Sequence, residues 1–266
     1  MKFNEDTYLY PHVVEEEENT LTTIVIDSTM LIVYILIGTA FFLIIPKIIK
    51  SSHKQTIIFK VIEILVFVMT GFFFIYGLFL YFMPPREASI FSALLTIALA
   101  LRRIIKGDIR NIIGGMSAGG AAILLGLSFP FQIIVVFSIL LILYDVISVF
   151  ITKHMVELAN IVLKNQLAMV LSIEEKEKNI SNVEVLKKGI SNRISLGTGD
   201  LLVPSTMAVS LIPIKLSIIY VLFSFIGFIV MVWMLNKLKR PLPALLPIMG
   251  TSLTLLFLYM YLNPVS

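Results

Sequence analysis

The sequence predicts an all-α fold, a polytopic bundle of transmembrane helices, and three observations support this prediction. Hydrophobic residues make up 58% of the 266-residue chain and charged residues only 14%, and the mean hydropathy is +0.97. Apolar stretches of roughly 20 residues, the length that crosses the hydrocarbon core of a membrane, follow one another along the chain. Basic residues gather in alternate gaps between these stretches. A soluble core of this length could not hide so much apolar surface from water.

We expect about eight membrane spans. The residues ahead of them, 1–23, form a polar tail that lacks the basic start and apolar middle of a signal peptide. A long connection, 151–195, separates the fifth span from the sixth. Its first part, to about Ile173, could prolong the preceding helix as an amphipathic stretch, and we expect its charged remainder to be mobile. The spans lie at about 28–45, 59–82, 88–105, 110–129, 131–150, 196–214, 216–235 and 243–262.

The basic residues predict the orientation of the chain, because cytoplasmic gaps carry an excess of Lys and Arg. The alternation places the N-terminus outside, the 151–195 connection inside and the C-terminus outside. The pI of about 9.2 follows from these charges, so we expect no nucleic-acid partner. The residues concerned are Lys47, Lys50, Lys54 and Lys60, then Arg102, Arg103, Lys106 and Arg110, and finally Lys237, Lys239 and Arg240.

Two aspartates lie inside apolar stretches. Asp145 belongs to the fifth span, and Asp200 closes a Gly-Thr-Gly-Asp run at the start of the sixth. An Asp at such depth costs roughly 2.5–3.5 kcal/mol on insertion, so it calls for a partner or a function. With a rise of 1.5 Å per residue, Asp145 lies about 9 Å and Asp200 about 6 Å from the inner side of a ~30 Å core. Because the two spans are consecutive and antiparallel, we expect the carboxyl groups to meet.

A carboxyl pair in a low-dielectric pocket shares a proton over some range of pH. The ionised member can take a proton from water while the protonated member donates to a scissile carbonyl oxygen, which hydrolyses a peptide bond without a metal or other cofactor. The chain has no cysteine, which excludes disulfides and cysteine nucleophiles. The same aspartates would equally serve as a proton relay or cation site in a transporter or channel. Their spacing alone does not separate the two functions.

Other polar features inside the apolar stretches predict structure rather than chemistry. Glu63 lies near the inner face beside Lys60, so we expect its side chain to snorkel toward water. A glycine-rich run at 114–120 is typical of a helix-packing seam, with Gly115 and Gly119 at the spacing of small residues that let helices approach.

The start of the last span adds a third element to the two aspartates. Three prolines enter the apolar stretch at 241–247. Proline removes backbone donors and obstructs an ordinary helix start, so this end should be partly irregular, beside protein or a water-filled cavity. By the predicted topology it lies at the depth of the aspartates.

In their order along the chain, these three motifs resemble those of the presenilin and signal peptide peptidase family of intramembrane aspartyl proteases. The motifs are Tyr144-Asp145, Gly197-Thr198-Gly199-Asp200 and Pro243-Ala244-Leu245. The sequence around Tyr144-Asp145 is most similar to the archaeal presenilin homologues. The resemblance extends from about the first span to the end and is strongest from about residue 141 onward.

The resemblance implies a role for each of these residues. Asp145 and Asp200 would be the catalytic pair. Gly197, Thr198 and Gly199 would shape the turn before Asp200 and influence substrate fit. Pro243, Ala244 and Leu245 would hold the site and help align an extended substrate segment, which could pair with an exposed strand edge nearby. The substrates would be transmembrane helices of other membrane proteins, which must unwind locally because a helix hides its amides.

The expected protein is therefore a multi-pass protease of the cell membrane with a presenilin-like fold. Its parts would be the tail 1–23, a scaffold half at 24–130 and a catalytic half at 131–266, with a cytoplasmic loop at 151–195 and an extracytoplasmic C-terminus. The family pattern has nine spans, and the one without a counterpart here is the first. A prepilin-type peptidase also has a Gly-x-Gly-Asp motif, but it does not account for Tyr144-Asp145 or the Pro243 motif. The transporter or channel remains the alternative from another class.

Overall fold

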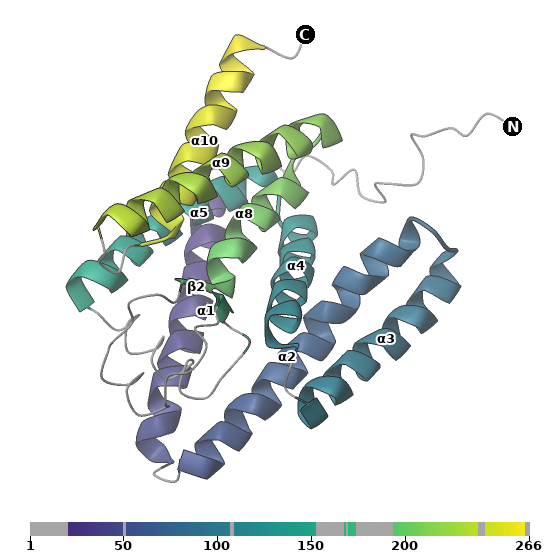
Figure 1. The fold of residues 1–266 in the computed structure, drawn as a ribbon. Coiled ribbons are helices and arrows are strands. Elements are labelled where there is room, and N and C mark those ends of the chain that lie inside the picture. The colour runs from purple at the N-terminus through teal and green to yellow at the C-terminus, as the bar shows by residue number, and fades with distance from the viewer. Residues whose placement is uncertain are drawn as a thin grey trace, which may run out of the picture.

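The structure is a computed structural model and is almost entirely helical (Figure 1). Its described part holds eight α-helices, one π-helical turn and two short strands, and this confirms the prediction of a polytopic α-helical bundle. The described residues are 21–49, 52–106, 109–152, 168, 170–173, 194–238 and 243–263. The predicted tail lies almost wholly outside them, as does most of the 151–195 connection.

Each predicted span has a helix in the structure, although α1 and α2 begin well before the predicted bounds. The first four are α1 (Leu21–Ile48), α2 (Ser52–Leu80), α3 (Pro85–Lys106) and α4 (Arg110–Ser128). The others are α5 (Phe131–Ile147), which continues into the π-helical turn η1 (Ser148–Thr152), then α8 (Thr198–Ser210), α9 (Ile214–Leu238) and α10 (Leu245–Leu262).

Seven of these helices are long and apolar enough to cross a membrane, and α8 is not among them. At 1.5 Å per residue, the 13 residues of α8 extend only about 20 Å, less than the ~30 Å hydrocarbon core. The sixth predicted span is therefore shorter than expected. Gly197 before α8 and Leu211 after it are both extended, and Pro213 has no backbone N–H with which to prolong the helix.

Large apolar side chains cover much of the outer surface of the bundle. The most exposed of them include Tyr34 (66%) and Ile37 (60%) on α1, Met69 (62%) on α2 and Phe225 (63%) on α9. A soluble monomer seldom exposes apolar surface on this scale, whereas lipid-facing helices require it. Together with the seven long apolar helices, this surface identifies a multi-pass membrane protein.

Helix α4 lies between α2 and α8 and joins the two halves of the bundle (Figure 1). Its glycines permit the close approach, since a Cβ on Gly120 would overlap the backbone oxygen of Thr70 on α2, and one on Gly126 would meet Val209 on α8. The glycine-rich run is thus a packing seam, as predicted. The predicted pair was wrong in part, because Gly115 faces open space and only Gly119 packs closely, against Phe74.

The largest buried apolar cluster lies among α5, α8, α9 and α10. Phe137 of α5, Met207 of α8, Tyr220 of α9 and Met249 of α10 are at its centre and almost fully buried. The hydroxyl of Tyr220 contacts the sulfur of Met249 at 3.4 Å and accepts a hydrogen bond from Ser252 at 3.2 Å. This core holds in place the ends of α5, α8 and α10 that carry the three motifs.

Two strands flank the long connection, one of them where an extension of the fifth helix was expected. Strand β1 (Val170–Ile173) pairs antiparallel with β2 (Ile194–Gly197), with Val170 opposite Gly197 and Ile173 opposite Ile194. The expectation of a helix to Ile173 was wrong for these four residues. Short apolar runs are ambiguous between helix and strand, and pairing with a distant segment decides this one.

Candidate active site

Asp145 lies in the last turn of α5, and its carboxylate contacts the start of α10. The residue is only 5% exposed. Its Oδ2 accepts a hydrogen bond from the backbone N–H of Leu245 at 3.2 Å. Leu245 is the first residue of α10, and the residue just before it makes no side-chain hydrogen bond that would cap the helix. The carboxylate therefore satisfies one of the backbone donors that a helix N-terminus leaves free, and it joins the first motif to the third.

Asp200 lies in the first turn of α8, directly after β2. Gly197 ends the strand and caps the helix in an extended conformation (φ −65°, ψ 139°). The backbone of Gly197 hydrogen-bonds the partly buried Asp200 carboxyl group. A Cβ on Gly197 would lie 3.1 Å from Oδ2 of Asp200, so the glycine permits a close approach of backbone and carboxylate.

The structure brings the two aspartates together. Helices α5, α8 and α10 contact one another, and the carboxyl groups of Asp145 and Asp200 lie within range of direct electrostatic interaction. Each carboxyl group is held by a backbone N–H, that of Leu245 in the third motif for Asp145 and that of Gly197 in the same motif for Asp200. The two carboxyl groups therefore interact, and their pairing at one depth of the membrane stays a prediction.

Pro204 adds a local feature to this end of α8. It lies inside the helix, four residues after Asp200. Because proline has no N–H, it cannot donate the usual helical hydrogen bond to the carbonyl of Asp200. The backbone carbonyl oxygen of Asp200 therefore does not receive the hydrogen bond that residue 204 would donate in an ordinary helix.

The remaining motif residues surround this pair in different ways. Tyr144 is partly buried and packs against the core of α5, α8, α9 and α10. Thr198 begins α8, and its methyl group would lie 3.2 Å from a Cβ on Gly114 of α4. Gly199 is exposed, with no atom within 4 Å of the position of a Cβ. Pro243 is buried, and Ala244 adopts the αR conformation just before α10.

The proline-rich entry to the last span is partly irregular, as predicted. Residues 243 and 244 precede the helix, while 239–242 lie outside the described residues. Pro247 falls in the first turn of α10, where its missing N–H disturbs no helical hydrogen bond. Among the described residues, no three His, Cys, Asp or Glu side chains gather in a way that could hold a metal ion.

One buried ionic contact near the site was missed from the sequence. Glu63 does not snorkel toward water, because it is 5% exposed and forms an ion pair with Arg103 of α3 at 2.8 Å. The expectation for Glu63 was wrong, because attraction to the opposite charge on the neighbouring helix offsets the cost of removing the carboxylate from water. Opposite charges near the inner ends of two consecutive spans were the signal that could have predicted this pair.

Comparison with known proteins agrees with this architecture. No curated protein matches the chain. Among solved structures, a presenilin family intramembrane aspartate protease is similar, with a TM-score of 0.59 and 19% sequence identity over 92% of this chain and 87% of the other. At that identity the likeness establishes the fold. A family model described as signal-peptide peptidase, presenilin aspartyl protease matches residues 13–263, and the chain therefore belongs to this family of membrane proteases.

Proposed function

We propose that this protein is an intramembrane aspartyl endopeptidase in which Asp145 and Asp200 form the catalytic dyad. The observation that carries the proposal is the electrostatic interaction of the two carboxyl groups from α5 and α8. Asp145 is held by the backbone N–H of Leu245 in the third motif, and Asp200 by the backbone of Gly197 in its own motif. Two carboxyl groups this close share a proton rather than both ionising. One protonated and one ionised carboxyl group are the acid and base that peptide hydrolysis needs.

The reaction uses a water molecule between the two side chains. The ionised carboxylate removes a proton from water as the water oxygen bonds to the scissile carbonyl carbon. The protonated carboxyl group donates its proton to the carbonyl oxygen, which gives a neutral tetrahedral diol. When the C–N bond breaks, one diol hydroxyl returns its proton to a carboxylate and the leaving nitrogen receives the proton that water gave up, so the dyad ends with one proton, as it began.

The substrates are transmembrane segments of other membrane proteins in the lipid bilayer. A helical substrate must first unwind, because its amides are enclosed by the helix. The β1–β2 sheet supports a route for the unwound segment, since β2 ends at Gly197 and leads into α8 three residues before Asp200. An extended segment that adds to this sheet satisfies its own backbone groups and passes the dyad. Tyr144, Thr198, Gly199, Pro243 and Ala244 then line the approach and set the fit.

The proposal includes an orientation in the cell membrane, with the 151–195 connection on the cytoplasmic side and the C-terminus on the opposite side. The alternation of basic gaps supports it. A single-span reporter presented to the reconstituted protein tests the function.

The expected result is hydrolysis of one bond within the apolar segment of the reporter, with products identified by mass spectrometry and cleavage blocked by a peptide mimic of the tetrahedral intermediate. Proton or cation flux through the same vesicles, dependent on Asp145 and without peptide products, would instead establish the transporter alternative.

A further inference from the structure

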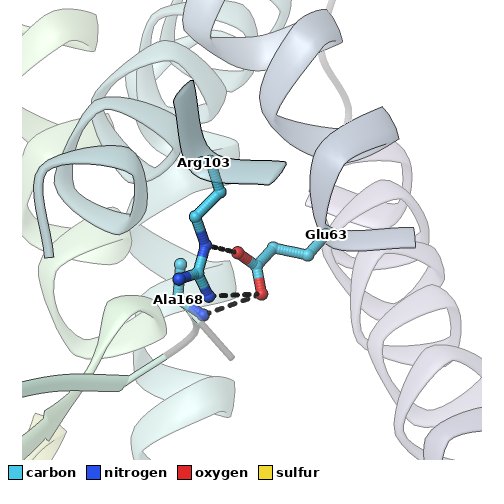
Figure 2. Close-up of polar contacts among 3 residues, drawn as sticks. All are labelled: Glu63, Arg103 and Ala168. Atoms are coloured by element: carbon cyan, nitrogen blue, oxygen red, sulfur yellow. Dashed lines mark hydrogen bonds and ion pairs between the residues drawn. The ribbon is translucent and has the colours of Figure 1, made fainter. Parts of the chain in front are cut away.

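A buried ion pair outside the dyad links three separate parts of the chain (Figure 2). Nε of Arg103 on α3 donates to Oε1 of Glu63 on α2 at 2.8 Å, and Nη2 of Arg103 lies 3.5 Å from Oε2. The second oxygen of Glu63 also accepts the backbone N–H of Ala168 at 3.1 Å. Both charged side chains are less than a tenth exposed, and Ala168 is 3% exposed.

Ala168 lies two residues before β1, so this contact fixes the approach of the chain to the sheet. Its other backbone group is held as well, because the carbonyl oxygen packs against Gly114 of α4, at only 2.2 Å from the position a Cβ would take. Thr198 also lies against Gly114, with its methyl group 3.2 Å from that same position. Residue 168 and the start of α8 therefore both pack against Gly114 of α4.

The energetics of such pairs favour a role in positioning over one in stability. Removing two charges from water costs about as much as their attraction returns, and apolar replacements of buried ion pairs are often neutral or stabilising. What an apolar pair could not supply is an acceptor for the N–H of Ala168. Glu63 has that acceptor because its Oε2 takes the backbone N–H of Ala168 at 3.1 Å in addition to the longer contact with Nη2 of Arg103, while Oε1 takes the shorter bond from Nε.

We propose that Glu63 and Arg103 are positioning residues that anchor β1, and through it the sheet beside Asp200, for an extended substrate segment. Arg103 orients and neutralises Glu63, and Glu63 holds Ala168. Strand β1 then pairs with β2 in a fixed register, with Val170 opposite Gly197. This inference rests on the proposed protease function and adds that substrate alignment depends on the scaffold helices α2 and α3, far from the dyad in sequence.

Two double variants isolate the backbone contact from the charges. Glu63→Gln with Arg103→Met removes both charges and keeps an amide oxygen that can accept from Ala168. Glu63→Met with Arg103→Met removes both charges and the acceptor, with a side chain of similar length. Neither leaves an unpaired buried charge, which would itself threaten folding. Ile75→Ala on α2, a buried site away from Ala168, is the control for a destabilised scaffold, because it creates a cavity.

The expected result separates substrate binding from chemistry. Glu63→Met/Arg103→Met raises KM for the reporter about tenfold, equivalent to ~1.4 kcal/mol, with kcat within about twofold, since the dyad is untouched. Deuterium exchange at Ala168 and in β1 becomes faster in the same variant. Glu63→Gln/Arg103→Met keeps KM and exchange close to those of the unmodified protein. Ile75→Ala lowers the melting temperature without changing KM.

Equal KM and equal exchange in the two double variants would overturn the inference, as would a KM that simply follows the melting temperature. Exchange measures the anchor without any chemistry, so it decides the question even if no reporter is cleaved. Failure of the proposed function is distinguished by Asp200→Asn in the same assay, because cleavage that survives this change rejects the dyad whatever the Glu63 variants do.

Discussion

At the scale of single residues, the two carboxyl groups are held by close contacts with the backbone. Asp145 takes a hydrogen bond from Leu245, and Asp200 takes one from Gly197. In both contacts the donor is a backbone N–H rather than a second polar side chain. Neither contact is therefore visible as a pair of complementary residues in the sequence. The motif residues around the aspartates matter because they permit these backbone contacts.

Gly197→Ala should reduce kcat about tenfold with a smaller effect on KM. The new Cβ would lie 3.1 Å from Oδ2 of Asp200, so the carboxylate must move by a few tenths of an ångström, and small misplacements of catalytic groups are costly. Steady-state cleavage of the reporter measures both constants. Gly115→Ala is the matched control, because a Cβ there meets nothing within 4 Å and activity should be unchanged. An unchanged kcat in Gly197→Ala would show that the close approach is not needed.

At the scale of elements, α4 is the helix on which both halves of the molecule rest. It contacts α2 on one side and α8 on the other, and its glycines allow the backbones to approach. The sequence predicted a seam here, but of the two glycines that it paired only Gly119 packs closely. The 3.6-residue period leaves several faces of a run with four glycines available, and only the neighbouring helices decide which face is used.

Gly120→Ala should destabilise the bundle by at least ~2 kcal/mol. The Cβ would overlap the carbonyl oxygen of Thr70, and a backbone atom cannot yield as a flexible side chain does, so the cost is at or above that of ordinary overpacking. Thermal unfolding of the purified protein in detergent measures the loss. Gly115→Ala, on the same helix, should leave the melting temperature unchanged or slightly raised, because alanine favours the helix over glycine. Equal melting temperatures for the two variants would contradict the proposed seam.

The short elements were the least predictable from sequence. The apolar residues of β1 form a strand because Ile194–Gly197 lies beside them, a long-range pairing that no local pattern encodes. Similarly, α8 is shorter than the predicted span 196–214, because residues 196 and 197 belong to β2 and the chain is extended at Leu211, just before Pro213. By contrast, the long helices were predictable, since some 20 consecutive apolar residues have few alternatives in a membrane. Their bounds were less so for α1 and α2, which begin well before the predicted spans.

At the scale of the whole molecule, composition was sufficient to predict a membrane bundle, and the order of three motifs was sufficient to suggest the family. The pairing of the two aspartates is a prediction from their depths and from the consecutive, antiparallel order of their spans, because rise per residue is fixed in a helix. Glu63 could not be interpreted in the same way. Its partner, Arg103, lies 40 residues away, and its other partner is a backbone N–H in the long connection.

The predicted orientation can be tested with single cysteines, because the chain has none of its own. In intact cells, Tyr81→Cys, an exposed site between α2 and α3, should react with a membrane-impermeant maleimide. Lys54→Cys, an exposed site in the first turns of α2, should react only after the cells are opened. The reverse pattern would place the 151–195 connection outside and contradict the basic-gap assignment.

The central claim is that Asp145 and Asp200 act as one dyad, and the most direct test is reporter cleavage by single Asp→Asn variants in vesicles. Asp145→Asn and Asp200→Asn should each reduce cleavage at least ~100-fold, because each removes one member of an acid–base pair, while their melting temperatures stay near that of the unmodified protein. Asp27→Asn, the same change in α1, should cleave normally. Cleavage that survives either change at the dyad, in folded protein, would contradict the account.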